Sequence, residues 1–502
     1  MRLFSMNLGQ ARARLVHSGP VSLAVVLIAG CGSAYRPVIT PINNSGPAPQ
    51  PSSYAIVVSA PSPASPGIAT IIDYSGDAVL AIAPIGPGPN TFTIDEFGAN
   101  GYTVNSDGTL SNFPISASLQ AKQVTYSTLP STAQPVNLFA PTNGLWAADL
   151  NGSLADYFSG SPQTFKLSIP VAPTPVLVVG SPTSGQRDFV ISENIPGATG
   201  MECNTSPAAQ PNGLATGIEV ASFAADTPIT LGKCPVFAVE SPDQRRVFVL
   251  NRGSDTISVI NAQDNTLDDQ CPPPTGCVNQ SGQTYFTHPS LPLSTTAGLA
   301  QDANHDVPAT AGPVYAEYNT ATSQLVVDDY AGNAISIIDV SVDEYGNDSP
   351  TFGTTFTVPV GNNPASVTVL YDGTRAYTAN QTDQTSTIVN LSSHTVEKTL
   401  PVNGHPRTVV STQNSTIGKV YVASPDSPFL TILRTDLDIV DTSILVEGNI
   451  VDVRVSTQNG TNGNVNVTSR VPGHGQPCYL PPGVDPPFTS SQTALQVCQT
   501  LP

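Results

Sequence analysis

Residues 364–401 read PASVTVLYDGTRAYTANQTDQTSTIVNLSSHTVEKTLP. The stretch holds four short runs rich in β-branched and aromatic residues, and Asp, Gly, Asn or Ser separate each run from the next. Its Asp372-Gly373 pair favours a tight hairpin, because both residues tolerate a positive φ. The stretch therefore predicts a unit of four antiparallel strands.

A proline followed sixteen residues later by Asn or Asp marks the same unit elsewhere in the chain. The second residue each time closes an apolar run such as VFVLN (247–251). A phrase of fixed length that returns along a chain indicates a modular fold whose units bury their faces on one another. The pairs are Pro89 and Asn105, Pro235 and Asn251, Pro313 and Asp329, and Pro364 and Asn380.

The joins between units repeat as well. An apolar-Pro-Val triplet stands at 169–171, 358–360 and 400–402, and each of its prolines is followed by the first proline of the next unit. A proline inside a strand removes a donor from the ladder, so these strands belong at a sheet edge, as the outermost strand of a propeller blade does. Four-stranded units of this length predict an all-β fold, a β-propeller. A solenoid of β-coils fits less well, because its repeats are shorter and lack paired hairpins.

The number of blades follows from the prolines that open each unit. Residues 451–456 and 464–470 look like two first strands without partners, and residues 69–86 look like two last strands. Together they predict a composite blade, built from both ends of the chain, that closes the ring. Literal counting gives eight blades, which are this one and the units opened by Pro89, Pro135, Pro175, Pro235, Pro313, Pro364 and Pro406.

Three stretches resemble the YVTN-type repeat of YncE-like, or lactonase-like, propellers: VFVLNRGSDTISVINAQDN (247–265), RAYTANQTDQTSTIVNL (375–391) and KVYVASPDSPFLTIL (419–433). The resemblance covers most of residues 54–471, which we take as the propeller domain. It implies seven four-stranded blades, so we expect seven and keep eight as the alternative. This repeat specifies a fold and leaves the function open.

The N-terminus has the pattern of a bacterial lipoprotein signal. Arg2, Arg12 and Arg14 precede the apolar run VSLAVVLI (21–28), and Ile-Ala-Gly-Cys then ends at Cys31. We expect residues 1–30 to be removed, Cys31 to be lipidated, and residues 31–53 to form a Pro/Ser-rich tether to the membrane. Gly32 favours the outer membrane or the cell surface over the inner membrane. The alternative is ordinary signal-peptidase cleavage nearby, with Cys31 a spare thiol.

Six further cysteines indicate disulfides in an exported chain. Zinc is the rival interpretation, but the sequence has no CxxC and no His at ligand spacing from these cysteines. Fifteen pairings are possible for six cysteines. We expect sequence neighbours to pair, as Cys203–Cys234, Cys271–Cys277 and Cys478–Cys498.

Two insertions interrupt the repeat, near residues 194–220 and 266–312. Insertions in a repeat protein tend to decorate one face, often the face that binds a partner. Residues 472–502 form a Pro-rich tail that the Cys478–Cys498 bridge would close. We therefore expect a rigid ring with stapled loops on one side.

One insertion holds a sequence similar to the start of a calcium loop. Asp302, Asn304 and Asp306 place oxygen ligands at alternate positions, but the Gly and the distal Glu of such a loop are missing. A solvated acidic loop fits better than a calcium site. We expect no cofactor, with calcium as the alternative.

Function is less well specified than fold. The chain has a formal net charge of −19 and only 18 Lys and Arg, which argues against nucleic acid as a partner. No Gly-x-Ser-x-Gly occurs, and we interpret His405 as a packed or hydrogen-bonded residue. Glu240, Asp328 and Asp329 are possible catalytic carboxylates, but strand-end carboxylates are usually solvated caps of turns.

The sequence thus favours a binding protein over an enzyme. We expect a membrane-anchored extracytoplasmic scaffold that presents a surface to a protein or glycan partner. The alternative is a lactonase-like hydrolase of sugar or acyl lactones, with or without the assistance of a metal ion, which the family resemblance alone implies.

Overall fold

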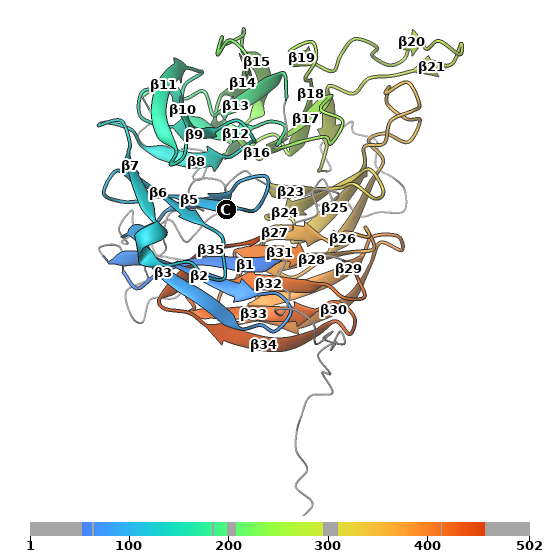
Figure 1. The fold of residues 1–502 in the computed structure, drawn as a ribbon. Helices are drawn as coiled ribbons and strands as arrows, with labels where there is room; N and C mark the ends of the chain where they lie inside the picture. Colours follow the sequence, from blue (N-terminus) through green and yellow to red (C-terminus); the bar gives the residue numbers. More distant parts are fainter. Residues whose placement is uncertain are drawn as a thin grey trace, which may run out of the picture. The chain divides into compact units, whose positions relative to one another are not determined.

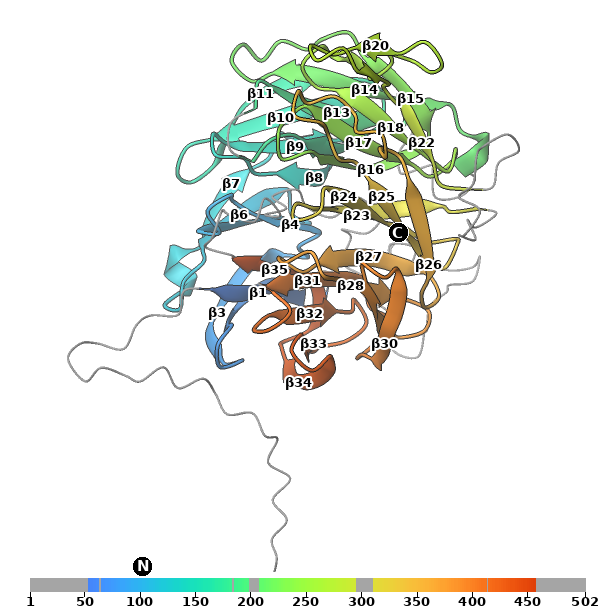
Figure 2. The same ribbon diagram turned by 90° about the vertical axis from the view of Figure 1, so that its right-hand side faces the viewer.

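Eight four-stranded antiparallel sheets make up the fold. The computed structural model describes residues 53–62, 65–182, 185–197, 207–294, 310–412 and 414–456. Figures 1 and 2 show the sheets following one another around a common centre, which is the arrangement of a β-propeller. In the described part of the chain the helices are the short 3₁₀ turns η1 (Ala121–Gln123) and η3 (Pro207–Ala209), and no helix there is long and apolar enough to cross a membrane.

The first four blades comprise residues 54–233 and one strand from the C-terminal part of the chain, residues 449–456. In each, the strands are given from the innermost to the outermost. Blade 1 holds β35 (Asn449–Ser456), β1 (Tyr54–Ala60), β2 (Pro66–Asp73) and β3 (Val79–Pro87); blade 2 holds β4 (Thr91–Ile94), β5 (Asn100–Val104), β6 (Thr109–Pro114) and β7 (Thr125–Thr128); blade 3 holds β8 (Pro135–Phe139), β9 (Leu145–Asp149), β10 (Leu154–Ser159) and β11 (Thr164–Pro170); blade 4 holds β12 (Pro175–Val179), β13 (Arg187–Ser192), β14 (Asn212–Glu219) and β15 (Ile229–Lys233).

The other four blades follow the same plan. Blade 5 holds β16 (Pro235–Glu240), β17 (Arg246–Asn251), β18 (Thr256–Asn261) and β19 (Thr266–Leu267), with β22 (Ser290–Pro292) also paired to β18; blade 6 holds β23 (Pro313–Asn319), β24 (Gln324–Asp329), β25 (Ala334–Asp339) and β26 (Thr355–Pro359); blade 7 holds β27 (Pro364–Val369), β28 (Arg375–Asn380), β29 (Thr385–Asn390) and β30 (Thr395–Pro401); blade 8 holds β31 (Thr408–Thr412), β32 (Lys419–Ala423), β33 (Phe429–Arg434) and β34 (Ile439–Leu445).

The ring has eight blades, so literal counting of the prolines is confirmed and the seven blades favoured by the resemblance are not found. The units opened by Pro135 and Pro175 are complete four-stranded blades.

Both chain ends build blade 1, as predicted, but they divide it differently. We expected two strands from each end, whereas β1, β2 and β3 come from the N-terminal side and β35 alone from the C-terminal side. β35 is the innermost strand and contacts the innermost strands β31 and β4 of the neighbouring blades. The run at Tyr54–Ala60 is buried at every position and takes the second place in the sheet. The predicted strand at 464–470 lies outside the described residues.

The prolines that open the units lie directly opposite the residues that close the second strands. Pro235 is the cross-strand partner of Asn251, Pro313 of Asp329 and Pro364 of Asn380, and a register shift follows each proline. A bulge explains why a residue without an N–H is tolerated at the end of this ladder. The recurring spacing is therefore the length of one inner hairpin.

Three of the closing asparagines are bonded within their own blade and also pack against a glycine of the preceding one. Asn380 donates to the hydroxyls of Thr385 (3.0 Å) and Thr387 (2.8 Å), and it lies against Gly361, which follows the outer strand of blade 6. A Cβ at Gly361 would come within 2.6 Å of the Asn380 amide, so only glycine allows this approach. The same contact joins Gly86 to Asn105 and Gly232 to Asn251.

Prolines end the outermost strands of three blades at the positions that the sequence predicts, and Pro87 ends the outermost strand of blade 1 as well. Pro170, Pro359 and Pro401 are the last residues of β11, β26 and β30, each of which is a sheet edge. Edge positions tolerate proline because no further strand needs the missing donor.

The predicted insertions contain blade strands. β14, the third strand of blade 4, lies within 194–220, so the excursion falls between β13 and β14. In the range 266–312, β22 pairs with β18 and continues the outer edge that the short β19 begins. Between them, β20 (Cys277–Val278) and β21 (Thr284–Tyr285) form a small hairpin.

Candidate functional site

Cations fill several of the gaps between blades on one face of the ring. The second strand begins with Arg or Lys in four blades, at Arg187, Arg246, Arg375 and Lys419. Each of these side chains reaches the turn that joins the third and outer strands of the following blade. We call such a side chain a gap cation and number each gap by the two blades that it separates.

The gap cations are matched by carboxylates and carbonyl oxygens. Arg246 bonds Asp268 at 3.1 Å and also pairs with Asp348 of the next blade. In gap 7/8, Nη1 of Arg375 donates to the carbonyl oxygen of Thr435 at 2.8 Å. In gap 4/5, Nη1 of Arg187 donates to the carbonyl oxygen of Ala262 at 2.7 Å. These charged pairs are partly or fully buried and close the gaps.

Two neighbouring gaps lack such a cation and contain pockets. Asn100 begins the second strand of blade 2, and Gly144 precedes the second strand of blade 3. A pocket of about 500 Å³ lies in gap 2/3, and a pocket of about 510 Å³ lies in gap 3/4. Both are lined by Pro141, so they open side by side.

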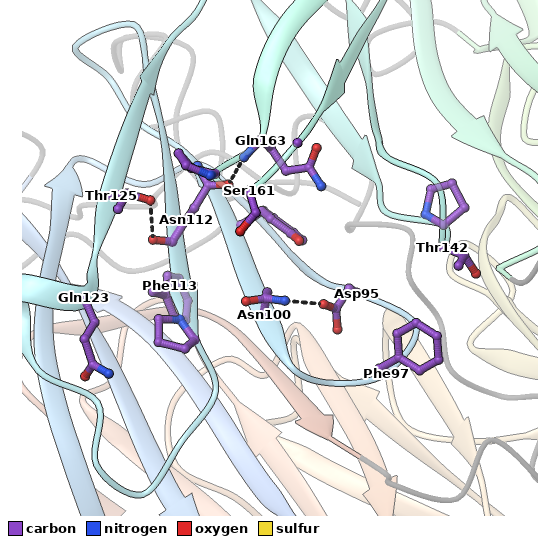
Figure 3. A pocket seen from close by; sticks show the side chains of 15 residues that line it. Asp95, Phe97, Asn100, Asn112, Phe113, Gln123, Thr125, Thr142, Ser161 and Gln163 are labelled. Carbon is purple, nitrogen blue, oxygen red and sulfur yellow. Dashed lines mark hydrogen bonds between the residues drawn. The ribbon is translucent and has the colours of Figure 1, made fainter.

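The gap 2/3 pocket is lined by amides, hydroxyls and aromatic rings. Figure 3 shows Phe113 and Gln123 toward one end of it, Phe97 and Thr142 toward the other, and Asn100 between them. Further lining residues include Asp95, Tyr102, Asn112, Thr125, Ser161 and Gln163.

Hydrogen bonds hold several of these polar groups in place. Nδ2 of Asn100 donates to Asp95 at 2.7 Å, and the backbone N–H of Gln163 donates to Oδ1 of Asn112 at 3.0 Å (Figure 3). Burial raises the pKa of Tyr102 to about 12, so this phenol keeps its proton. The side-chain oxygen of Gln163 is buried and has no hydrogen-bond partner among the described residues. The pocket therefore offers fixed donors and acceptors to a polar ligand.

The gap 3/4 pocket combines aromatic rings with carboxylates. Trp146, Tyr157 and Phe223 line it, with ring centroids 4.8 Å apart for Trp146 and Tyr157 and 4.8 Å apart for Tyr157 and Phe223. Asp188 and Glu219 line it as well. Arg187 pairs with Glu219, so the charge of that carboxylate is balanced.

Asp188 is the unusual residue of this pocket. It is only 2% exposed, although it is the second residue of β13, where β17, β24, β28 and β32 have Val247, Leu325, Ala376 and Val420. Burial raises the pKa of Asp188 to about 7, and a hydrogen bond from the Trp146 side chain lowers it in part. Asp188 forms no ion pair with any residue that the structure describes.

The opposite ends of the second strands carry a different set of residues. Tyr330 follows β24 directly, Arg252 follows β17, and Gln381 follows β28. The Arg252 guanidinium lies 5.6 Å from the centre of the Tyr330 ring, and the Tyr330 hydroxyl donates to Gln381 at 3.1 Å. Burial lowers the pKa of Arg252. These contacts link blades 5, 6 and 7.

Two of the three carboxylates considered for hydrolysis, Asp328 and Asp329, are buried, which corrects their interpretation as solvated caps, and Glu240 is partly buried. Asp328 and Asp329 are both 0% exposed, because they end a strand that is covered on both faces. Burial raises the pKa of Asp329 to about 8, and its Oδ2 accepts from Ser336 at 2.6 Å. Burial, and then the nearby Asp188, raise the pKa of Glu240 to about 8. Glu240 ends the first strand of blade 5, whereas Asp329 ends the second strand of blade 6, and first and second strands run antiparallel.

The remaining predicted site residues fall in three groups. Cys271 and Cys277 form a disulfide, and Cys234 is disulfide-bonded too. His405 is hydrogen-bonded, since its Nδ1 lies 2.6 Å from Oδ2 of Asp426 in a partly buried pair just before the first strand of blade 8. Outside the described residues lie Cys31, Cys203, Cys478, Cys498, Asp302, Asn304 and Asp306.

No group of three or more His, Cys, Asp or Glu side chains within the described ranges could hold a metal ion. Sequence reasoning missed both pockets. The signal for the gap 3/4 pocket was an acid, Asp188, in an otherwise apolar run (RDFVIS), and it stands out only once the blades are aligned.

No protein-family model matches the chain, and no curated protein matches it. Similar solved structures are β-propeller proteins. Apo AztD from Citrobacter koseri is 11% identical with a TM-score of 0.53, over 80% of this chain and 97% of that one. The dihydro-heme d1 dehydrogenase NirN in complex with DHE is 12% identical with a TM-score of 0.55, over 82% of this chain and 76% of that one.

A putative 6-phosphogluconolactonase from Bacteroides fragilis is 14% identical with a TM-score of 0.48, over 82% of this chain and 99% of that one. The two structures with TM-scores above 0.5 support the propeller fold and nothing beyond it. They do not distinguish a scaffold from a hydrolase.

Proposed function

We propose that the protein is an exported, lipid-anchored propeller scaffold that binds a glycan in the gap 2/3 pocket. The observation behind the proposal is the lining of that pocket, which combines side-chain amides, hydroxyls and one carboxylate, Asp95, with aromatic rings. Sugar hydroxyls both donate and accept hydrogen bonds, and Asn and Gln side chains do the same. The apolar faces of sugar rings match the faces of Phe and Tyr.

The free groups of the pocket support this ligand class. The unpartnered side-chain oxygen of Gln163 is an acceptor that a hydroxyl would satisfy. Phe97 is 64% exposed at the pocket, which leaves its ring available for stacking. The volume of about 500 Å³ falls within the range of roughly 300–1,000 Å³ usual for small-ligand sites.

The expected membrane tether suits such a role. A lipidated Cys31 followed by a Pro/Ser-rich segment would hold the propeller outside the cell membrane, where glycans are abundant. The outer membrane or the cell surface remains our proposal for the location.

A glycan array probed with the full-length protein tests this function. We expect binding to a limited set of glycans, and about tenfold weaker binding for Phe97→Ala, since one stacked ring is lost. Phe429→Ala is the matched control, because Phe429 is also exposed (41%) but lies in blade 8. Equal binding by the two variants, or no binding to any glycan, would contradict the proposal.

The lactonase-like alternative is tested with the same material. Acid release from sugar and acyl lactones, with and without added calcium, would show turnover if the protein were a hydrolase. Turnover that persists in Phe97→Ala would favour the hydrolase over the glycan scaffold.

A further inference from the structure

We call the four gaps that contain a gap cation the charged gaps. Gap 3/4 differs from them at three positions. Gly144 stands where gaps 4/5, 5/6, 7/8 and 8/1 have a cation. A Cβ at Gly144 would come within 2.6 Å of the Tyr157 ring, so the tyrosine takes the space of the missing side chain. In gap 3/4 an aromatic side chain therefore occupies the space that Arg or Lys occupies in the charged gaps.

The second difference lies in the turn after the third strand. The fourth residue after this strand has a positive φ in five blades, at Asp77, Phe223, Asn265, His394 and Asp438. Asp77 and Asp438 bind gap cations, whereas Phe223 lines the pocket. A positive φ is uncommon for a bulky residue and much easier for Asn or Asp. The backbone conformation at this turn therefore disfavours a bulky residue, and Phe223 stands there nonetheless.

The third difference is the buried acid. Asp188 replaces an apolar residue and has no cationic partner among the described residues, and Oε2 of nearby Glu240 is buried without a hydrogen-bond partner there. A buried carboxylate without a counter-ion is costly, so proteins rarely keep one in a merely structural position. Asp188 lines the pocket together with Tyr157 and accepts from Trp146.

These three differences describe one kind of ligand. We propose that the gap 3/4 pocket binds the cationic head of an organic molecule, with Trp146, Tyr157 and Phe223 as the aromatic wall and Asp188 as the counter-ion. The ligand cation takes the place that Arg or Lys side chains of the protein take in the charged gaps. Aromatic faces attract ammonium and guanidinium groups, and a nearby carboxylate strengthens the attraction in a desolvated site.

A purely apolar filling of the gap does not account for the same observations. Such a filling would neither retain a buried acid nor leave a pocket of about 510 Å³ beside it. The proposal does not depend on the glycan site, because the two pockets share only Pro141.

The chain contains one Trp, and Trp146 lines this pocket, so its fluorescence reports on the site directly. The full-length protein is titrated with choline and with agmatine, which carry an ammonium and a guanidinium head. The neutral control is 3,3-dimethylbutan-1-ol, in which a carbon atom replaces the choline nitrogen. We expect a saturable change in Trp fluorescence with at least one of the two cations and at least tenfold weaker binding of the neutral alcohol.

Two variants separate the charge from the aromatic wall. Asp188→Asn keeps the shape and removes the charge, and we expect it to weaken cation binding by about tenfold or more without affecting the neutral alcohol. Phe223→Asn introduces the residue found at the matching turn of blade 5, and we expect several-fold weaker binding with the fold retained. Asp226→Asn is the matched control, because Asp226 pairs with Arg187 in the adjacent gap and does not line the pocket.

Unchanged fluorescence with both cations would overturn the proposal. Equal affinity for choline and its neutral analogue would overturn it too, since the site would then be an apolar pocket. The same holds if Asp188→Asn binds the cations as well as the Asp226→Asn control does.

Discussion

Lys419 of blade 8 binds Asp77 of blade 1 at 2.6 Å, across 342 residues of sequence. Its ammonium group also donates to the carbonyl oxygen of Tyr74 at 2.8 Å. Both charged side chains are largely buried, at 5% and 11% exposure. This pair fills the gap in which the last blade meets the first, so it helps to hold the ring closed.

Replacing Lys419 by Met is expected to lower the free energy of unfolding by about 3 kcal/mol, because the Asp77 carboxylate then stays buried without its cation. Burial already raises the pKa of Asp77, and Lys419 opposes that effect. Urea denaturation at neutral pH measures the loss. Adding Asp77→Asn to the Lys419→Met variant should recover part of the stability, and an absence of any recovery would show that the pair is not the cause.

Asn380 and Gly361 are expected to be energetically coupled. Asn380→Ala removes three side-chain hydrogen bonds, two donated to Thr385 and Thr387 and one accepted from Thr378, and should cost about 2 kcal/mol of unfolding free energy. Gly361→Ala should also destabilise the protein, because its new Cβ would meet the Asn380 amide. In the Asn380→Ala background the same glycine change should cost much less. A double-mutant cycle measures this difference, and simple additivity would refute the contact as the reason for the glycine.

The fold could be predicted because its repeating contacts lie within one hairpin. Pro364 and Asn380 are direct cross-strand partners, so their separation in sequence is fixed by the strand length. Prolines at sheet edges, such as Pro401, leave an equally local mark. The division of blade 1 was harder to predict, because an apolar run such as Tyr54–Ala60 has no turn or proline of its own to identify its place in the sheet.

The pockets could not be predicted, because they depend on contacts between blades. Arg246 meets Asp348 from 102 residues away, and nothing in either local sequence indicates the pair. The absence of a gap cation at Gly144 becomes visible only when the start of each second strand is known. A blade repeat therefore predicts its own hairpins well and the filling of its gaps poorly.

Stability is expected to depend on pH through Asp188. An Asp carboxyl in an unfolded chain has a pKa of about 3.9, whereas burial raises the pKa of Asp188 to about 7. Between these values the folded protein holds a proton that the unfolded chain has lost. The contribution of protonated Asp188 to the free energy of unfolding is therefore fully present below pH 4. It is lost as the pH rises through 7, by on the order of 4 kcal/mol.

In the Asp188→Asn variant the free energy of unfolding should not show this decrease with rising pH. Tyr157, Trp146 and Glu240 face Asp188, and Glu240, whose pKa burial raises to about 8, adds a loss of the same sign at slightly higher pH. Guanidinium denaturation at pH 5 and pH 8 compares the two proteins. The free energy of unfolding of the variant, relative to that of the wild type, should be higher at pH 8 than at pH 5. If this difference between the two proteins does not change with pH, Asp188 is excluded as the titrating group.

A chain that ends at Ser456 should keep the propeller, whereas one that ends at Gly448 should lose it. The second deletion removes β35, which pairs with β1 from Tyr54↔Ser456 to Ala60↔Asn449 and lies innermost in blade 1. It also removes Asp452, whose carboxylate accepts from Thr408 of blade 8 at 3.0 Å. The inner edge of β1 would then be open, and such an edge favours aggregation. Thermal denaturation and size-exclusion chromatography compare the two chains with the full-length protein. If the chain ending at Ser456 also unfolds, a second C-terminal strand is needed and the closure by β35 alone is wrong.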